Sequence, residues 1–400
     1  MRELHPLQKL EINGGYIMEA NERYLKIWKL LNRLAHGYLE RRFGFEHETL
    51  NPEGPCLIVA NHVTNWDPLL LAISFPNRHI HFVASEHLFR MGWKSKLINY
   101  LVAPIPRRKG ANGAATALDC LRKMRAGGAI CIFGEGETTW DGRSGKVFPA
   151  TGTLAKLSGA SLITYRFEGA YLTAPRWGDS VRKGKMRGRM VRTYAPEQLK
   201  AMTPQQIEDA MNADIYEDAW ARQSLEKVRF KGGNRTKHIE TALFMCPKCK
   251  SVGTLLGKGN AVTCSCGLHV SMNEYGTFDS PAPFENIAQW DEWQHARLLD
   301  EDFAHEGAYF SEAEVTLAQL DQAGAETVLL TGELSIDRAA LSIGERSFPL
   351  AEIDDMALIQ RRKLAFMHSN MYYELQTPEP RCLRKYYAAW KNAAARAKNA

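Results

Sequence analysis

Residues 57–67 read Leu-Ile-Val-Ala-Asn-His-Val-Thr-Asn-Trp-Asp, and a proline follows them. The apolar run from Cys56 to Ala60 predicts a short buried strand. The polar pair Asn61-His62 indicates where the chain leaves the sheet, and Asp67 with the next proline is a common helix entry. His62 would then stand at a strand end and Asp67 at a helix start, within reach of each other. A carboxylate on one imidazole nitrogen leaves the other nitrogen free to act as a base.

Strand-like and helical patterns alternate from this stretch to about residue 170, with Gly127-Gly128 as a helix stop. Such alternation predicts an α/β fold with a largely parallel sheet, whose sites lie at the carboxyl ends of the strands. His62 and Glu135 each follow one such strand end. The expected strands are Cys56–Ala60, Ile80–Ala84, Ala129–Phe133 and Leu162–Phe167, and the expected helices are Pro68–Ser74, Gly92–Tyr100, Ala114–Arg125 and Gly152–Leu157.

The motif Asn61-His62-x4-Asp67 after an apolar strand resembles the first motif of the PlsC-type glycerolipid acyltransferases. The resemblance covers roughly residues 50–200. It implies transfer of a fatty acyl group from acyl-CoA or acyl-carrier protein to the hydroxyl of a lysophospholipid, such as 1-acyl-sn-glycerol-3-phosphate, giving phosphatidic acid. It implies that His62 is the general base, that Asp67 orients it, and that Asn61 belongs to the substrate site.

A second motif candidate, residues 104–110, reads Pro-Ile-Pro-Arg-Arg-Lys-Gly. Its two prolines exclude a regular helix and predict a rigid extended segment that ends in cations and can present a guanidinium to a phosphate. The resemblance implies that Arg107 binds the acceptor phosphate. Pro106 stands where the family usually has an acid, so Arg108 is a second candidate for this role.

A third motif, residues 133–139, resembles the family's Phe-Pro-Glu-Gly-Thr-Arg-Ser motif, and Glu135 and Gly136 match it. The resemblance implies that these two residues shape the acceptor site. Thr138 replaces the family's arginine, for which Arg143 is a substitute candidate. Residues 163–169 resemble the family's later Val-Pro-Val strand and glycine only in part.

Two segments are candidates for contact with anionic lipid. The expected helix over residues 24–39, closed by cations at 41–42, has Trp28 and Tyr38 on a broad apolar face, and it either packs on the core or lies in the membrane interface. Residues 176–192 hold seven cations against one acid, which indicates either a solvated hairpin or a surface for lipid headgroups or coenzyme A phosphates. The cations of the second segment are Arg176, Arg182, Lys183, Lys185, Arg187, Arg189 and Arg192.

Two close cysteine pairs, Cys246 with Cys249 and Cys264 with Cys266, follow a linker-like stretch at residues 230–237. In a reducing compartment this spacing predicts tetrahedral zinc in a structural ribbon. The second pair is separated by one residue rather than two, which leaves His269 as a possible substitute ligand.

The remaining pattern, residues 310–375, predicts short antiparallel strands, and a helix over 384–396 ends the chain. Strands plus one closing helix resemble a PH-like small barrel. Residues 203–224, which begin with Thr203-Pro204, predict one helix. The expected strands are Glu314–Gln319, Thr327–Thr331, Glu333–Ile336, Ala340–Ile343, Arg346–Pro349, Leu364–His368 and Tyr372–Gln376.

Length and composition set the wider frame. A chain of 400 residues with 45% apolar residues suggests two or three domains. The resemblances and the cysteine spacing imply what these are: an acyltransferase domain at 1–235 with an amphipathic helix at about 24–42, a zinc ribbon at 241–280, and a PH-like domain at 305–400. A net charge of +6 does not indicate nucleic acid as a partner. No apolar run approaches the roughly 20 residues that span a bilayer, so we expect a cytoplasmic protein, peripheral on the inner face of the membrane.

Two other functions fit the same sequence. One is an acyltransferase for another acceptor, such as a lyso-aminolipid, which the partial matches at Pro106 and Thr138 allow. The other is a zinc-ribbon binding factor with a degenerate acyltransferase domain, which the intact His62, Asp67 and Glu135 motifs argue against.

Overall fold

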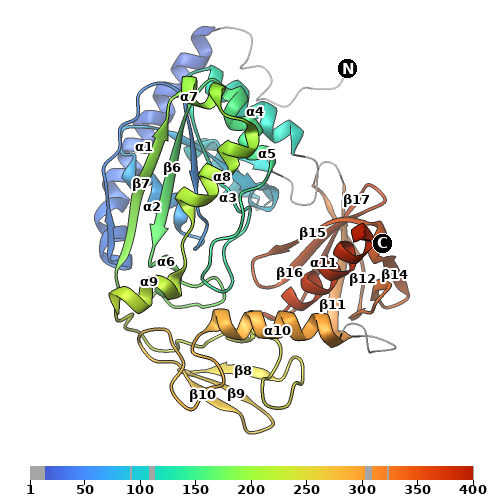
Figure 1. The fold of residues 1–400 in the computed structure, drawn as a ribbon. Helices are drawn as coiled ribbons and strands as arrows, with labels where there is room; N and C mark the ends of the chain where they lie inside the picture. The colour runs from blue at the N-terminus through green and yellow to red at the C-terminus, as the bar shows by residue number, and fades with distance from the viewer. Residues whose placement is uncertain (1–13, 91, 108–112, 302–308, 322–323, 400) are drawn as a thin grey trace.

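The computed structural model describes residues 14–90, 92–107, 113–301, 309–321 and 324–399. The described chain forms three parts: an α/β layer, a small β ribbon, and a second sheet with a closing helix (Figure 1). The predicted α/β fold with a largely parallel sheet is confirmed in the first part, and an antiparallel sheet forms the last part.

The first sheet has seven strands in the order β1-β7-β6-β2-β5-β3-β4. Strands β6, β2, β5, β3 and β4 are parallel, and β7 runs antiparallel to β6. Strand β7 overlaps the basic stretch of residues 176–192 and ends two residues beyond it, where no apolar run predicts a strand. The bounds are β1 Phe45–His47, β2 Cys56–Ala60, β3 Ile80–Ser85, β4 Ile105–Arg107, β5 Ala129–Phe133, β6 Ser161–Glu168 and β7 Met186–Tyr194.

Strand β2 is apolar throughout because both of its faces are covered. Ile58 and its same-face neighbours lie in a core cluster with side chains of α1 and α2, whereas Leu57 and Val59 lie in a second cluster with α4, α5 and α8. Every residue of β2 is fully buried. A parallel strand buried on two faces shows a continuous apolar run rather than alternation, which is the pattern seen here.

The helices of this part flank the sheet, with α1 and α8 on opposite faces (Figure 1). The single helix expected over 203–224 is two helices, because residues 216–218 leave the helical conformation and Asp218 caps the second one. The bounds are α1 Gly14–Phe43, α2 Asp67–Ser74, η2 Glu86–Arg90, α3 Trp93–Val102, α4 Ala114–Arg125, α5 Ala150–Ser158, α6 Ala170–Thr173, α7 Pro196–Ala201, α8 Pro204–Ile215 and α9 Ala219–Glu226.

Helix α1 is longer than the sequence predicts, and it packs on the core through Trp28. The Trp28 indole is buried and its Nε1 donates to the Phe75 carbonyl oxygen at 2.8 Å. Of the two alternatives for this helix, packing on the core therefore holds at Trp28. Leu30, Leu34 and Tyr38 remain more than half exposed on the same helix.

The ribbon and an unpredicted helix connect the two sheets. The ribbon is an antiparallel sheet of three strands, and α10 lies between the predicted second and third domains (Figure 1). The bounds are η3 Ile239–Thr241, β8 Leu255–Lys258, β9 Ala261–Cys264, β10 His269–Ser271 and α10 Ile287–Glu301.

The last part is an antiparallel sheet in the order β14-β13-β12-β11-β17-β16-β15, with α11 packed on β15 and η4. Two expected strands form the single strand β12, and β15 was not expected. The likeness to a PH-like barrel stays a prediction. The bounds are β11 Phe310–Leu320, β12 Glu326–Ile336, β13 Ala340–Ile343, β14 Arg346–Pro349, η4 Leu350–Glu352, β15 Ile353–Ile359, β16 Lys363–His368, β17 Met371–Gln376 and α11 Arg384–Asn399.

Ion pairs and hydrogen bonds dock this last part on the α/β layer. Arg361 binds the Asp179 carboxylate at 2.5 Å and the Trp177 carbonyl at 2.9 Å, and Arg90 pairs with the buried Glu374. The second sheet is therefore held over the α/β layer. None of the helices in the described ranges combines the length and apolar character needed to cross a bilayer.

Candidate active site

His62 and Asp67 meet at the carboxyl end of β2. The His62 Nδ1 lies 2.8 Å from Asp67 Oδ2, which confirms the predicted contact. Asp67 begins α2 and is fully buried, yet its carboxylate bonds backward along the chain: it accepts hydrogen bonds from the Val63 and Thr64 amides and from the Thr64 hydroxyl. Because Asp67 Oδ2 already accepts from two N–H groups, it acts as an acceptor for His62, which places the ring proton on Nδ1.

The His62 ring is held from its other side by Phe133, the last residue of β5. The two rings stack with centroids 4.4 Å apart at 20°. The His62 side chain keeps 21% exposure and lines a cleft. The imidazole is thus fixed in orientation by Asp67 and Phe133, with Nε2 as its free acceptor.

Asn61 does not lie where the resemblance implies. It is fully buried, its Nδ2 donates to the Phe167 carbonyl at 3.0 Å, and its Oδ1 accepts from the Phe167 amide at 2.8 Å. Asn61 is absent from the residues that line the cleft in the described part of the chain. Its side chain therefore joins the end of β2 to β6, which corrects the expected role in substrate binding.

Glu135 follows β5, and its carboxylate holds two backbone segments of the site. Its Oε1 accepts from the His62 amide at 2.9 Å and its Oε2 from the Gly145 amide at 2.6 Å. Burial raises the pKa of Glu135 to about 8, although both amide hydrogen bonds oppose that rise. The carboxyl group lies at the cleft, but its described hydrogen bonds are with the backbone amides of His62 and Gly145. Its predicted part in acceptor binding stays a prediction.

Gly136 and Arg107 both lie against the ring of Phe148. Gly136 has a φ of +75°, and a Cβ there would lie 2.1 Å from Phe148 Cε2, so both backbone conformation and space require glycine. The Arg107 guanidinium carbon lies 4.3 Å from the centroid of the Phe148 ring. Burial lowers the pKa of Arg107, and Asp355 opposes that effect. Arg108 lies outside the described residues.

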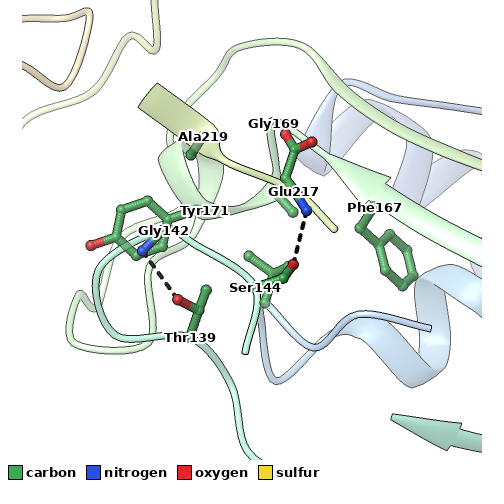
Figure 2. A pocket seen from close by; sticks show the side chains of 10 residues that line it. Thr139, Gly142, Ser144, Phe167, Gly169, Tyr171, Glu217 and Ala219 are labelled. Atoms are coloured by element: carbon green, nitrogen blue, oxygen red, sulfur yellow. Dashed lines mark hydrogen bonds between the residues drawn. The ribbon is translucent and has the colours of Figure 1, made fainter. Parts of the chain in front are cut away.

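The loop behind His62 is packed. The Thr139 amide donates to the His62 carbonyl at 3.0 Å, and Thr139 Oγ1 accepts from the Gly142 amide at 3.1 Å. This loop borders a void of about 10 Å³. Figure 2 shows the side chains around it, with the Ser144 hydroxyl oxygen accepting from the Glu217 amide. Such a void has room for about one water molecule. The void is too small for a substrate. The loop supports the His62 main chain through the hydrogen bond from the Thr139 amide.

A cleft of about 1070 Å³ opens in front of His62, between the α/β layer and the last part of the chain. Its first wall comes from the carboxyl ends of β2, β3, β4 and β5, and its second wall comes from β15 and α11. Among its charged side chains, Arg176 is paired with Glu137 at 3.1 Å. The second wall contains residues 355–361 together with Tyr387, Trp390 and Lys391.

Most cations of the stretch 176–192 are engaged inside the molecule. Arg182 is buried and donates to the Arg235 carbonyl at 2.6 Å, and Arg189 pairs with Glu168 at 2.6 Å. This stretch is therefore not the free basic surface that its composition indicates. The other ion pairs of this stretch include Arg176–Glu137, Lys185–Glu46 and Arg187–Glu226.

Arg143, the substitute candidate for the third motif, lines the cleft but is also engaged. It pairs with Glu292 at 2.5 Å and with Asp218 at 3.4 Å. Glu292 lies on α10, so this guanidinium joins the α/β layer to the connecting helix. The geometry assigns Arg143 a structural contact rather than the place of the motif arginine.

The four cysteines come together in the ribbon with their ligand atoms within 4.8 Å of one another. The Sγ atoms of Cys246 and Cys266 are 3.7 Å apart, and those of Cys249 and Cys264 are 3.8 Å apart. Tetrahedral zinc with Zn–S bonds of roughly 2.3 Å requires Sγ atoms about 3.8 Å apart. The four thiols therefore fit zinc. His269 is exposed and lies outside this group.

Comparison with known proteins bears on the first part of the chain. Residues 42–166 match the family model described as Acyltransferase. This range contains His62, Asp67, Arg107 and Glu135. The chain is also similar to the crystal structure of the 1-acyl-sn-glycerophosphate (LPA) acyltransferase PlsC from Thermotoga maritima, with a TM-score of 0.38 and 15% identity over 57% of this chain and 86% of that one.

Sequence reasoning missed the second wall of the cleft. Ala357 lies 295 residues after His62 in the sequence, and Tyr387 lies 325 residues after it. No motif or spacing connects either residue to the stretch that contains His62. It also missed Phe148, which contacts Gly136 and Arg107. The glycine at position 136 was the only signal, since a glycine in a motif often indicates close approach of another group.

Proposed function

We propose that the protein is an O-acyltransferase that moves a fatty acyl group from a thioester to the free hydroxyl of a lysophospholipid such as 1-acyl-sn-glycerol-3-phosphate. One observation carries the proposal. His62 is bonded through Nδ1 to the buried Asp67 and faces a large cleft, within a range that matches the Acyltransferase family model. The match supports acyl transfer as the chemistry, and the contact with Asp67 supports His62 as its base.

In the proposed reaction the acceptor hydroxyl gives its proton to His62 Nε2. Its oxygen forms a bond to the thioester carbonyl carbon, and the C–S bond then breaks. The leaving thiolate takes the proton back from His62, so the base is restored. Asp67 keeps the ring oriented and stabilises its positive charge while the proton is held. The donor is acyl-CoA or acyl-carrier protein.

Arg107 is the proposed partner of the acceptor phosphate. It lines the same cleft as His62, and stacking on Phe148 restrains its guanidinium. A restrained guanidinium loses less entropy when it binds a phosphate than a free one does. A lyso-aminolipid is the alternative acceptor.

A direct assay tests the proposal. Purified full-length protein is given acyl-CoA or acyl-carrier protein and a panel of lyso-acceptors, and released thiol and acylated lipid are measured together. We expect one molecule of acylated lipid for each thiol that is released. Thiol release without acylated lipid would indicate a thioesterase, and absence of both with every donor and acceptor would contradict the proposed function.

We expect the second wall of the cleft to limit the space for substrate. Ala357 is half-buried on β15 and lines the cleft. Replacing Ala357 by tryptophan should fill part of it and lower kcat/KM by about tenfold or more, equivalent to about 1.4 kcal/mol. Ala340→Trp is the matched control, because Ala340 is also half-buried on the same sheet but does not line the cleft. Equal loss in both variants would show a folding effect instead.

Peripheral membrane binding is a further part of the proposal. Helices α1 and α3 pack against each other, and Arg23 of α1 lies over the Tyr100 ring of α3 at 4.7 Å. Both helices carry large exposed apolar side chains, and both carry exposed cations. The apolar side chains are Leu30, Leu34, Tyr38, Trp93, Leu97 and Tyr100, and the cations include Lys26, Lys29, Arg33, Lys94 and Lys96.

Replacing Trp93, which is 70% exposed, by serine should weaken sedimentation with anionic vesicles without lowering the melting temperature. Leu225→Ser is the matched control, since Leu225 is 84% exposed on the distant helix α9. Salt should weaken binding because the cations act at the surface. Equal binding of the Trp93 variant and the parent would exclude this face.

A further inference from the structure

A second group of metal-ligand side chains lies at the outer edge of the first sheet. His36 and Glu40 are one turn apart on α1, and His47 ends the edge strand β1. His36 Nε2 is 3.2 Å from Glu40 Oε1, and His47 Nε2 is 3.7 Å from the same oxygen. One ligand atom from each residue lies within 4.8 Å of the other two. Two imidazoles and one carboxylate thus converge.

The hydrogen bond at the far side of His47 decides which of its nitrogens is free. Its Nδ1 lies 3.2 Å from the Glu48 carbonyl oxygen, which can only accept, so Nδ1 carries the proton. In the neutral ring, Nε2 is then a bare acceptor, and it faces the carboxylate oxygen of Glu40. A proton donor or a cation between these two acceptors satisfies both of them. The His47 side chain is only 3% exposed, whereas Glu40 keeps 41% exposure, so the gap between them opens to solvent on the Glu40 side alone.

The frame around His47 is rigid before any ion arrives. The ring stacks on Phe45 at 5.1 Å and 14°, and its backbone pairs with Gly188 of β7. The turn from α1 to β1 passes through Gly44, whose φ is +58° and whose Cβ would lie 2.4 Å from the Gly184 carbonyl oxygen. This tight turn brings the end of α1 beside β1. Ligands held in place in this way lose little freedom on binding.

We propose that His36, Glu40 and His47 bind a divalent transition-metal ion, with zinc as the expected ion. Tetrahedral zinc with ligands at roughly 2.0–2.1 Å needs ligand atoms about 3.3 Å apart, close to the two observed separations. Nitrogen and carboxylate ligands suit zinc, and a hydrogen bond from the second ring nitrogen to a carbonyl is typical of a metal-binding histidine.

The position of the site suggests what the ion does. His36 and Glu40 keep 37% and 41% exposure, so a fourth position is open to water from the solvent side. The ion would join the last turns of α1 to the edge strand, which has only three residues. This role is structural and independent of acyl transfer.

Metal binding to the full-length, untagged protein tests the proposal. Metal-free protein is titrated with cobalt(II), followed by competition with zinc. The cysteine group should give an intense thiolate-to-cobalt absorption. The proposed site should add a further equivalent of cobalt with only weak d–d bands, because it contains no sulfur. Saturation after the thiolate equivalent alone would overturn the proposal.

Two variants and one control complete the test. His36→Ala and Glu40→Gln alter partly exposed side chains, so the fold should persist, and each should lose the second equivalent while keeping the thiolate absorption. His368→Ala is the control, because His368 also pairs with a glutamate, Glu352 at 3.0 Å, but belongs to no three-residue group in the described chain. It should retain both equivalents. Retention of both by His36→Ala would refute the assignment.

Discussion

Replacing His62 by alanine is expected to lower acyl transfer by about 10²–10⁴-fold, the usual contribution of a general base. The fold should survive, because His62 is a loop residue with 21% side-chain exposure and its loss opens no enclosed core cavity. The backbone contacts of residue 62 with Glu135 and Thr139 do not need the imidazole. The measurements are turnover with the preferred lyso-acceptor and the melting temperature of each protein.

Asn65→Ala is the control for this variant. Asn65 is an exposed residue of the same loop that lines the same cleft, but it lies outside the His62–Asp67 pair. Its turnover should stay within a few-fold of the parent. Near-parental turnover in His62→Ala would remove His62 from the mechanism.

Asp67→Asn should also lose activity, with a fall in stability as well. The new amide nitrogen or oxygen must replace a carboxylate that accepts from two backbone amides, the Thr64 hydroxyl and His62. Activity therefore has to be compared at a temperature where the variant is folded.

Replacing Cys246 and Cys249 together by serine is expected to remove the bound zinc and unfold the ribbon. Zinc binding in small cysteine and histidine sites supplies roughly 10–16 kcal/mol, and in such small units that energy is part of folding. Amide hydrogen exchange should rise over residues 241–280, and elemental analysis should show the loss of one zinc. The rise should be largest there, because one face of the α/β sheet packs in a core cluster that contains no ribbon residue.

Cys382→Ala serves as the matched control. Cys382 is also a buried free cysteine, but it lies before α11 and outside the four-cysteine group. It should keep the full zinc content. Protein purified without metal, or a disulfide in place of the thiols, would contradict a zinc ribbon.

Several features of this protein follow from its sequence alone because they depend on residues close together along the chain. The apolar run of β2 ends where Asn61 and His62 begin, and a spacing of five residues brings Asp67 back to the imidazole. Within each cysteine pair the spacing is also local, and it is this spacing that predicts zinc, although the thiols that meet across the pairs lie 15 and 20 residues apart. A few covalent links leave such groups little freedom, so local pattern is enough to predict their contact.

Other features were decided only when distant elements packed together. Asn61 bonds to Phe167 rather than facing the cleft, and Trp28 packs in the core. Cations of the stretch 176–192 bind carboxylates and carbonyl oxygens of other segments. The second wall of the cleft forms because a sheet some three hundred residues along the chain docks over His62. Partners that far apart are chosen by the shape and charge of folded surfaces, and sequence spacing carries no information about those surfaces.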